Sequence, residues 1–168
     1  MTLVVADASP LHYLILIEQQ DLLARLYTAV VIPSQVAEEL SRPSTPVSVR
    51  AWIRSSPAWL TVDARPLGER IRNLDPGEAD AIALAVQLGA DVLLIDEQRG
   101  RAEARRLGLR PLGVVGVLEQ AAQRDLVELE PALSRLVSTT NFRIAGRVID
   151  EILLRDRQRR SRGPGLAP

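Results

Sequence analysis

The sequence predicts an α/β fold with three layers, in which a central parallel sheet of about five strands is covered by helices on both faces. Three observations predict it. Short apolar runs of strand length alternate along the chain with segments of helical periodicity. Hydrophobic residues make up 46% of the sequence and aromatic residues only 3%, so aliphatic side chains must build the core. The length of 168 residues is usual for one domain, and no internal repeat divides the chain.

Five apolar runs are expected to form the strands. The runs LVV and VLLI, which end just before Asp7 and Asp96, are apolar throughout. Continuous apolar runs are typical of central strands that are buried on both faces, so these two should lie in the middle of the sheet. The expected strands cover residues 2–6, 29–32, 59–62, 91–95 and 109–112.

Helices are expected where apolar residues recur at helical spacing after a capping residue or a proline. Asp75-Pro76 opens the clearest one, and its apolar side chains cover so much of the circumference that it should be well buried. Residues 65–74 are polar and poorly periodic, which predicts a connection rather than a regular element. The expected helices cover residues 9–19, 21–26, 33–41, 47–55 and 75–88, a segment around 102–107, one ending near 124, and two between 131 and 155.

The domain is expected to cover residues 1–155, with residues 131–155 as a C-terminal helical extension. Beyond it the chain loses its apolar residues and becomes rich in arginine, glycine and proline. Such a segment buries too little surface to offset its loss of conformational entropy, so residues 156–168 are predicted to be a flexible basic tail.

Composition narrows the possible chemistry. Acidic and basic residues balance at 21 each, and all basic residues are arginine, so no global charge attracts a polyanion. Without cysteine and with one histidine, thiolate and histidine-rich metal sites are excluded, which leaves oxygen ligands and hence Mg²⁺ or Mn²⁺. No apolar stretch is long enough to span a membrane and no signal peptide is visible, so a soluble, cytoplasmic protein is expected.

Two aspartates stand where ligands bind in open α/β sheets, beyond the carboxyl ends of the strands. Asp7 follows the first expected strand, and Asp96 follows the fourth. If these strands are neighbours, the two carboxylates converge and repel each other unless they share a proton or a divalent cation. For either aspartate alone, a turn former or a helix N-cap is the more common role. The pair, together with further acids, favours a metal site.

Further acids lie on two expected helices. On the helix of residues 33–41, about 100° per residue places Glu39 beside the buried face and Glu38 nearly opposite it. Glu39 is therefore a candidate and Glu38 a solvated charge. Glu78 and Asp80 lie on opposite flanks of the apolar stripe of the helix expected at residues 75–88. Helical geometry therefore does not show which of the two acids belongs to the site. Acids are also common in the first turn of any helix, where they complement the macrodipole.

Other polar residues near the two aspartates have weaker signals. Ser9 could cap its helix, orient Asp7 by a hydrogen bond, or do both, and capping is the simpler interpretation. His12 lies among apolar helix residues and is expected to be packed or solvated rather than a ligand. Four arginines follow Asp96 and could contact phosphates or form a solvated helix face: Arg99, Arg101, Arg105 and Arg106.

Taken together, these segments resemble the PIN-domain superfamily, and within it the branch similar to VapC-like toxins. The resemblance lies in the order and spacing of the pieces and extends over nearly the whole chain except the tail. The matching segments are ADASPLHYL at 6–14, VIPSQVAEEL at 31–40, LDPGEADAIALA at 74–85 and VLLIDEQRGRAEARRLGL at 92–109.

The resemblance implies a five-stranded parallel sheet and cleavage of single-stranded RNA with Mg²⁺ or Mn²⁺. It also implies a role as the toxin of a toxin–antitoxin pair, with a cognate antitoxin as partner, and a homodimer. Asp7, Glu39, Asp80 and Asp96 match the acids that hold the metal in this family. Glu78 matches a glutamate that this branch has two residues earlier, so the third acid is either Glu78 or Asp80.

The sequence departs from many VapC-like proteins just after Asp96, where Glu97 and Gln98 stand in place of a further aspartate and an aromatic residue. This departure concerns the second metal position and, with the neutral net charge, motivates a second hypothesis, in which the chain is a PIN-like module that binds RNA or protein without cleaving. The metal-dependent ribonuclease stays the leading hypothesis. Two other acidic-pocket folds fit less well. A phosphoryl-accepting receiver requires a lysine, which the chain lacks, and a haloacid-dehalogenase-like phosphatase requires an aspartate where Ser9 stands.

Overall fold

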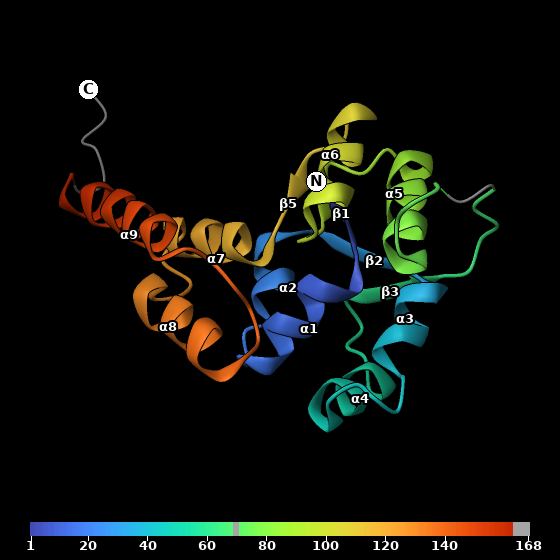
Figure 1. The fold of residues 1–168 in the computed structure, drawn as a ribbon, viewed down its shortest axis with the longest axis horizontal. Coiled ribbons are helices and arrows are strands. Elements are labelled where there is room, and N and C mark those ends of the chain that lie inside the picture. The colour runs from blue at the N-terminus through green and yellow to red at the C-terminus, as the bar shows by residue number, and fades with distance from the viewer. Residues whose placement is uncertain (69–70, 163–168) are drawn as a thin grey trace.

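The computed structural model describes residues 1–68 and 71–162, and these form a five-stranded parallel sheet between two layers of helices (Figure 1). The strand order is β3-β2-β1-β4-β5. The predicted fold class is therefore confirmed, and the run before Asp7 is the central strand, as expected. The strands are β1 (Leu3–Ala6), β2 (Ala29–Pro33), β3 (Leu60–Asp63), β4 (Val92–Leu94) and β5 (Pro111–Leu112).

The register of the sheet positions the ends of β1 and β4 side by side. Ala6 pairs with Leu94, and the backbone N–H of Asp7 donates to the carbonyl oxygen of Leu94 at 2.9 Å. The first residues after both strands thus lie at the same edge of the sheet. This is the edge at which parallel α/β sheets bind ligands.

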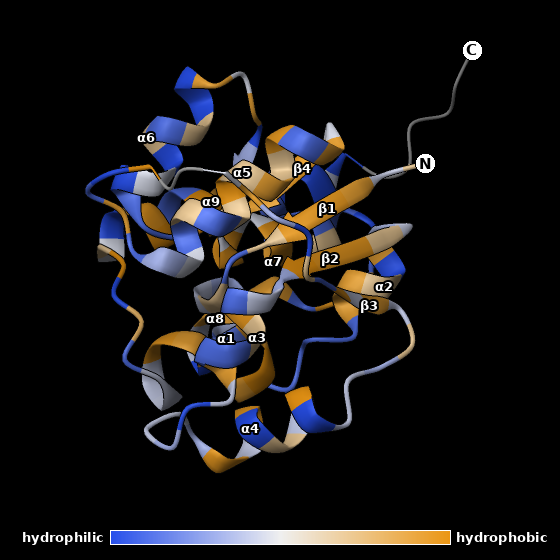
Figure 2. Ribbon diagram, turned by 90° about the vertical axis from the view of Figure 1, so that its right-hand side faces the viewer, coloured by the Kyte–Doolittle hydropathy of each residue, from blue (hydrophilic) through white to orange (hydrophobic). Residues whose placement is uncertain are grey.

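Alternating side chains of the strands divide the core into two clusters. Val4 and Ala6 of β1 belong to the cluster that packs against α1, α2 and α7, whereas Val5 belongs to the one beneath α5 and α6. Figure 2 shows that strands β1 and β2 are mostly hydrophobic, whereas the helices around them mix hydrophobic and hydrophilic residues. The helices are α1 (Ala8–Leu16), α2 (Leu22–Leu26), α3 (Ser34–Leu40), α4 (Val47–Arg54), α5 (Pro76–Leu88), α6 (Gln98–Arg106), α7 (Val114–Gln123), α8 (Leu129–Thr139) and α9 (Gly146–Ser161).

Helix α5 has the ends that its sequence predicts. Asp75 is its N-cap residue and forms a capping box with Glu78, while Pro76 occupies the first helical position. Gly89 ends the helix in the left-handed conformation, with φ of 59°, which costs glycine little because it has no Cβ. Most of the helix is buried, as predicted. It forms the layer that covers β1 and β4 on one face.

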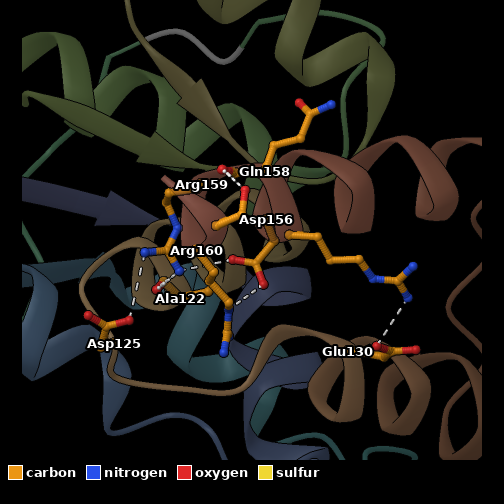
Figure 3. A network of polar contacts seen from close by, with 9 residues as sticks. Ala122, Asp125, Glu130, Asp156, Gln158, Arg159 and Arg160 are labelled. Atoms are coloured by element: carbon orange, nitrogen blue, oxygen red, sulfur yellow. Dashed lines mark hydrogen bonds and ion pairs between the residues drawn. The ribbon is translucent and has the colours of Figure 1, made fainter. Parts of the chain in front are cut away.

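The prediction of a flexible tail from residue 156 is wrong for residues 156–161, which continue helix α9. Polar contacts order this segment where apolar ones are few (Figure 3). The Asp156 carboxylate accepts hydrogen bonds from Arg159 at 3.0 Å and Arg160 at 2.8 Å. Arg159 also donates to the carbonyl oxygen of Ala122 in α7 at 2.8 Å. Pairs three and four residues apart stabilise a helix, and the contact with α7 fixes it to the domain.

The rest of the predicted tail, residues 163–168, lies outside the described residues, as do residues 69–70 of the predicted connection at 65–74. Within the described part of the chain, none of the helices has the length and apolar character needed to cross a membrane.

Candidate active site

Asp7 is the first residue after β1 and the N-cap residue of α1, and only 3% of it is exposed. Burial raises the pKa of Asp7 to about 7, because a buried carboxylate loses hydration. The backbone amides of Ala8 and Ser9 lower this pKa, while the negative charges of Glu78 and Glu39 raise it further. The structure therefore places three acids close enough to act on one another.

Glu39 reaches this group from α3, and the absence of a side chain at Gly77 makes room for it. The Glu39 Oε1 accepts a hydrogen bond from the backbone N–H of Gly77 at 3.1 Å. A Cβ atom at Gly77 would lie 2.5 Å from Glu39 Oε2, so glycine is the residue that permits this approach. Glu38 is exposed, so the predicted contrast between the two glutamates is confirmed.

Glu78 is one of the two acids that the sequence left as alternatives, and its negative charge raises the pKa of Asp7. Glu78 is buried, which raises its pKa, and the nearby charges of Asp75, Glu97 and Glu39 add to the increase. Its Oε2 also accepts a hydrogen bond from the Asp75 backbone N–H at 3.4 Å as part of the capping box. Asp80 is buried two residues further along α5 and so lies on the opposite flank of that helix.

Asp96 follows β4 and turns toward α7. Its Oδ1 accepts a hydrogen bond from the backbone N–H of Val114 at 2.9 Å. Its Oδ2 is buried and has no hydrogen-bond partner in the described part of the chain. Burial raises the pKa of Asp96 to about 6, although the Val114 amide and the positive charge of Arg101 lower it. A Cβ at Gly113 would lie 2.6 Å from Asp96 Oδ1 and 2.7 Å from Arg101 Nη1, so this close packing requires glycine.

The acids lie at one edge of the sheet but do not converge on a single point. Asp7 acts with the acids of α3 and α5, whereas Asp96 binds the start of α7. Over residues 1–68 and 71–162, no three acidic or histidine side chains are arranged to hold one metal ion together. Glu39 and Asp96 instead each accept a hydrogen bond from a backbone N–H, that of Gly77 for Glu39 and that of Val114 for Asp96. The convergence of the Asp7 and Asp96 carboxylates stays a prediction.

The donor atoms nevertheless suit a divalent cation. All of them are carboxylate oxygens, the ligand type that Mg²⁺ and Mn²⁺ prefer. The unpartnered Oδ2 of Asp96 is a buried oxygen with capacity for a ligand, which is rare because buried polar atoms are normally paired.

Comparison with known proteins identifies the family. A family model described as PIN domain matches residues 3–157. The chain belongs to the PIN-domain family. A search of solved structures matches a PilT N-terminus domain protein from the hyperthermophilic archaeon Sulfolobus solfataricus P2. That match has a TM-score of 0.51 and 16% identity, and it covers 85% of this chain and 100% of the archaeal one. No curated protein matches the sequence.

The family match covers the sheet, helices α1 to α8 and the part of α9 up to residue 157. This PIN domain therefore includes most of α9. PIN domains are generally nucleases and generally use divalent metal ions. The resemblance inferred from the sequence is thus confirmed for the superfamily. The assignment of individual acids to metal binding or catalysis stays a prediction.

Two further predictions for this PIN domain concern residues of α1. Ser9 does not cap the helix, because α1 begins at Ala8 and Asp7 occupies the N-cap position. Ser9 is exposed in the first turn, where its backbone amide acts on Asp7. His12 is half-buried, which lowers its pKa, and its ring contacts the edge of Tyr13. This agrees with a packed histidine.

The sequence did not single out several residues that shape the site of this PIN domain. Gly77 and Gly113 allow carboxylates to approach the backbone, and Arg101 is the one arginine after Asp96 that acts on its charge. A glycine inside or directly before a helical segment is the available signal for a close approach. No comparable signal separates Arg101 from its neighbours, because that distinction depends on the direction of α6.

Proposed function

We propose that this PIN domain is a divalent-metal-dependent endoribonuclease that hydrolyses phosphodiester bonds of single-stranded RNA. The observation that carries the proposal is the buried, unpartnered Oδ2 of Asp96 at the strand edge where Asp7 is also buried. Buried carboxylate oxygens without partners are costly to the fold, and functional sites are where proteins tolerate that cost.

In this proposal Asp7, Glu39 and Asp96 hold Mg²⁺ or Mn²⁺, with Glu78 or Asp80 as the further acid. The cation, when bound, polarises the phosphodiester and stabilises the charge on the leaving oxygen. Backbone amides of Ala8 and Ser9 orient the Asp7 carboxylate, and the amide of Val114 orients that of Asp96.

The remaining part of the proposal concerns biological context and rests on the resemblance to VapC-like proteins. We propose that the chain acts in the cytoplasm as the toxin of a toxin–antitoxin pair. A cognate antitoxin is its protein partner, and a homodimer is its assembly. Co-purification with the product of the neighbouring gene, followed by loss of ribonuclease activity in the complex, tests this part separately from the chemistry.

The direct test is cleavage of an end-labelled single-stranded RNA with Mn²⁺ or Mg²⁺, and with EDTA. We expect cleavage with either metal, no cleavage in EDTA, and strong loss of cleavage in Asp7→Asn and Asp96→Asn. Glu38→Gln is the matched control, because Glu38 is an exposed acid next to Glu39. RNA that stays intact with Mn²⁺, or cleavage that survives both EDTA and Asp96→Asn, would refute the proposal.

A second candidate function is an inactive PIN module that binds RNA or a partner protein. It is favoured by the absence, in the described residues, of three acids arranged around one point, and by Glu97 at the position of a further aspartate. Calorimetry with Mn²⁺ separates the two candidates. The nuclease binds Mn²⁺ and loses this binding in Asp96→Asn, whereas the inactive module binds RNA without metal-dependent cleavage.

A further inference from the structure

A hollow of about 470 Å³ lies beside Asp96, between the start of α7 and the segment that enters α9. We call it the Asp96 groove. Its lining combines apolar side chains with guanidinium groups, and the residues used below are Asp96, Arg101, Phe142, Arg143, Ile144 and Arg155. The metal-binding proposal uses only Asp96 of this set.

The arginines of the Asp96 groove differ in how their charges are compensated. Arg155 donates to Glu119 at 2.8 Å and is paired. Arg101 lies against Gly113 and its charge acts on Asp96. Arg143 is exposed, donates to the carbonyl oxygen of Phe142 at 3.3 Å, and forms no ion pair within the described part of the chain. A positive charge at the rim of the groove is thus available to an anionic ligand.

Aromatic rings gather at the same place although the chain has few of them. The whole sequence contains one Phe, two Tyr, two Trp and one His. Three of these rings form a contact series, with centroids 5.4 Å apart for His12 and Tyr13 and 5.1 Å apart for Tyr13 and Phe142. Both contacts are edge-on, so these rings do not stack face to face on one another. Phe142 lines the Asp96 groove, and the other two line a second hollow beside Glu39.

We infer that the Asp96 groove is a nucleotide subsite, in which a base of single-stranded RNA stacks on Phe142 and an adjacent phosphate binds Arg143. This inference rests on the proposed function. An apolar floor with a ring and an unpaired guanidinium at its rim complements a base and its phosphate. A base in a duplex has no free face for Phe142, so the groove selects single strands. The subsite would hold the nucleotide next to the phosphodiester at Asp96.

The test measures binding without cleavage. A single-stranded RNA with 2-aminopurine reports stacking by its fluorescence in EDTA, at several salt concentrations. We expect Phe142→Leu to weaken binding about five-fold or more at every salt concentration, as loss of one base–aromatic stack does. We expect Arg143→Gln to lower the slope of log K against log salt by about 0.7, the value for one phosphate contact on a single strand. Arg147→Gln, an exposed arginine on the first turn of α9, should change neither quantity.

Each result decides the inference. Unchanged affinity in Phe142→Leu, an unchanged salt slope in Arg143→Gln, or equal binding of duplex RNA would overturn it, and a protein segment would then be the better occupant. If Phe142→Leu fails to fold, the salt slope of Arg143→Gln decides alone, since Arg143 is exposed. Cleavage by the unmodified protein is assayed in parallel. RNA binding that depends on Arg143, without any cleavage, would refute the proposed nuclease activity and support the subsite. Cleavage with an unchanged KM in both variants would support the nuclease activity and refute the subsite.

Discussion

Asp7→Asn is expected to stabilise the fold at neutral and alkaline pH when no divalent metal is bound. Burial raises the pKa of Asp7 from 3.8 to about 7 in the folded chain. The folded state therefore binds more protons than the unfolded state between these values, and stability falls as pH rises through that window. Each pKa unit corresponds to about 1.4 kcal/mol, so the ionised carboxylate costs up to about 4 kcal/mol at alkaline pH.

Asparagine has the same shape without the charge, but its amide must also be buried, which offsets part of the gain. We expect a net stabilisation of about 1–3 kcal/mol at about pH 8 and little change at about pH 3, where Asp7 is protonated in the folded chain and mostly protonated in the unfolded chain. For a chain of this size that is an increase in Tm of roughly 3–10 °C.

Urea unfolding in EDTA, followed by the fluorescence of Trp52 and Trp59, measures this effect. Glu38→Gln removes an exposed charge and is the control, with almost no change expected at either pH. Mn²⁺ should then stabilise the unmodified protein more than Asp7→Asn, because only a ligand that binds the folded state adds stability. An Asp7→Asn chain that is less stable than the unmodified protein at alkaline pH, or equally shifted at both pH values, would refute the reasoning.

Three further predictions concern the surroundings of the site. Gly113→Ala places a Cβ 2.6 Å from Asp96 Oδ1. It should reduce cleavage at least about ten-fold and lower the free energy of urea unfolding by about 1–3 kcal/mol. Gly146→Ala, where a Cβ meets nothing within 4 Å, should leave cleavage unchanged and leave stability unchanged or slightly higher. Glu78→Gln should reduce Mn²⁺ affinity in calorimetry more than Asp80→Asn, because the charge of Glu78 raises the pKa of Asp7. The opposite order would assign Asp80 as the third acid. A chain that ends at residue 155 should have a free energy of unfolding about 1–3 kcal/mol lower than a chain that ends at residue 162, because it loses the hydrogen bond from Arg159 to Ala122. Equal stability of the two chains would show that these contacts contribute nothing.

The sheet and most helices could be predicted because local signals agree with the tertiary structure. The apolar runs before Asp7 and Asp96 are buried on both faces in β1 and β4, and their position at strand ends follows from the topology of any parallel sheet. Helix α5 was predictable for the same reason, because its capping residue, its proline and its apolar pattern all indicate the same boundaries.

Other features depend on contacts between distant segments and leave no local pattern. Residues 156–161 are too polar to predict as ordered, and the contact that fixes them joins Arg159 to a carbonyl oxygen in α7. Ser9 resembles an N-cap residue, but α1 begins earlier because Asp7 has the extended backbone of a cap. The choice between Glu78 and Asp80 likewise requires knowing which flank of α5 faces β1.

The side chains of Asp7 and Asp96 leave the sheet toward opposite faces because of one residue of register. Ala6 pairs with Leu94, so Asp7 stands level with Ile95 and shares the sheet face of Val5, beneath α5. Asp96 comes one residue later and, because successive side chains alternate, it faces α7 instead. A cation or a phosphate that contacts both carboxylates must therefore lie past the end of the sheet rather than over either face. Asp96 and Phe142 line the Asp96 groove, while Glu39 and Tyr13 line the second hollow, so an RNA strand that occupied both hollows would meet both groups of acids.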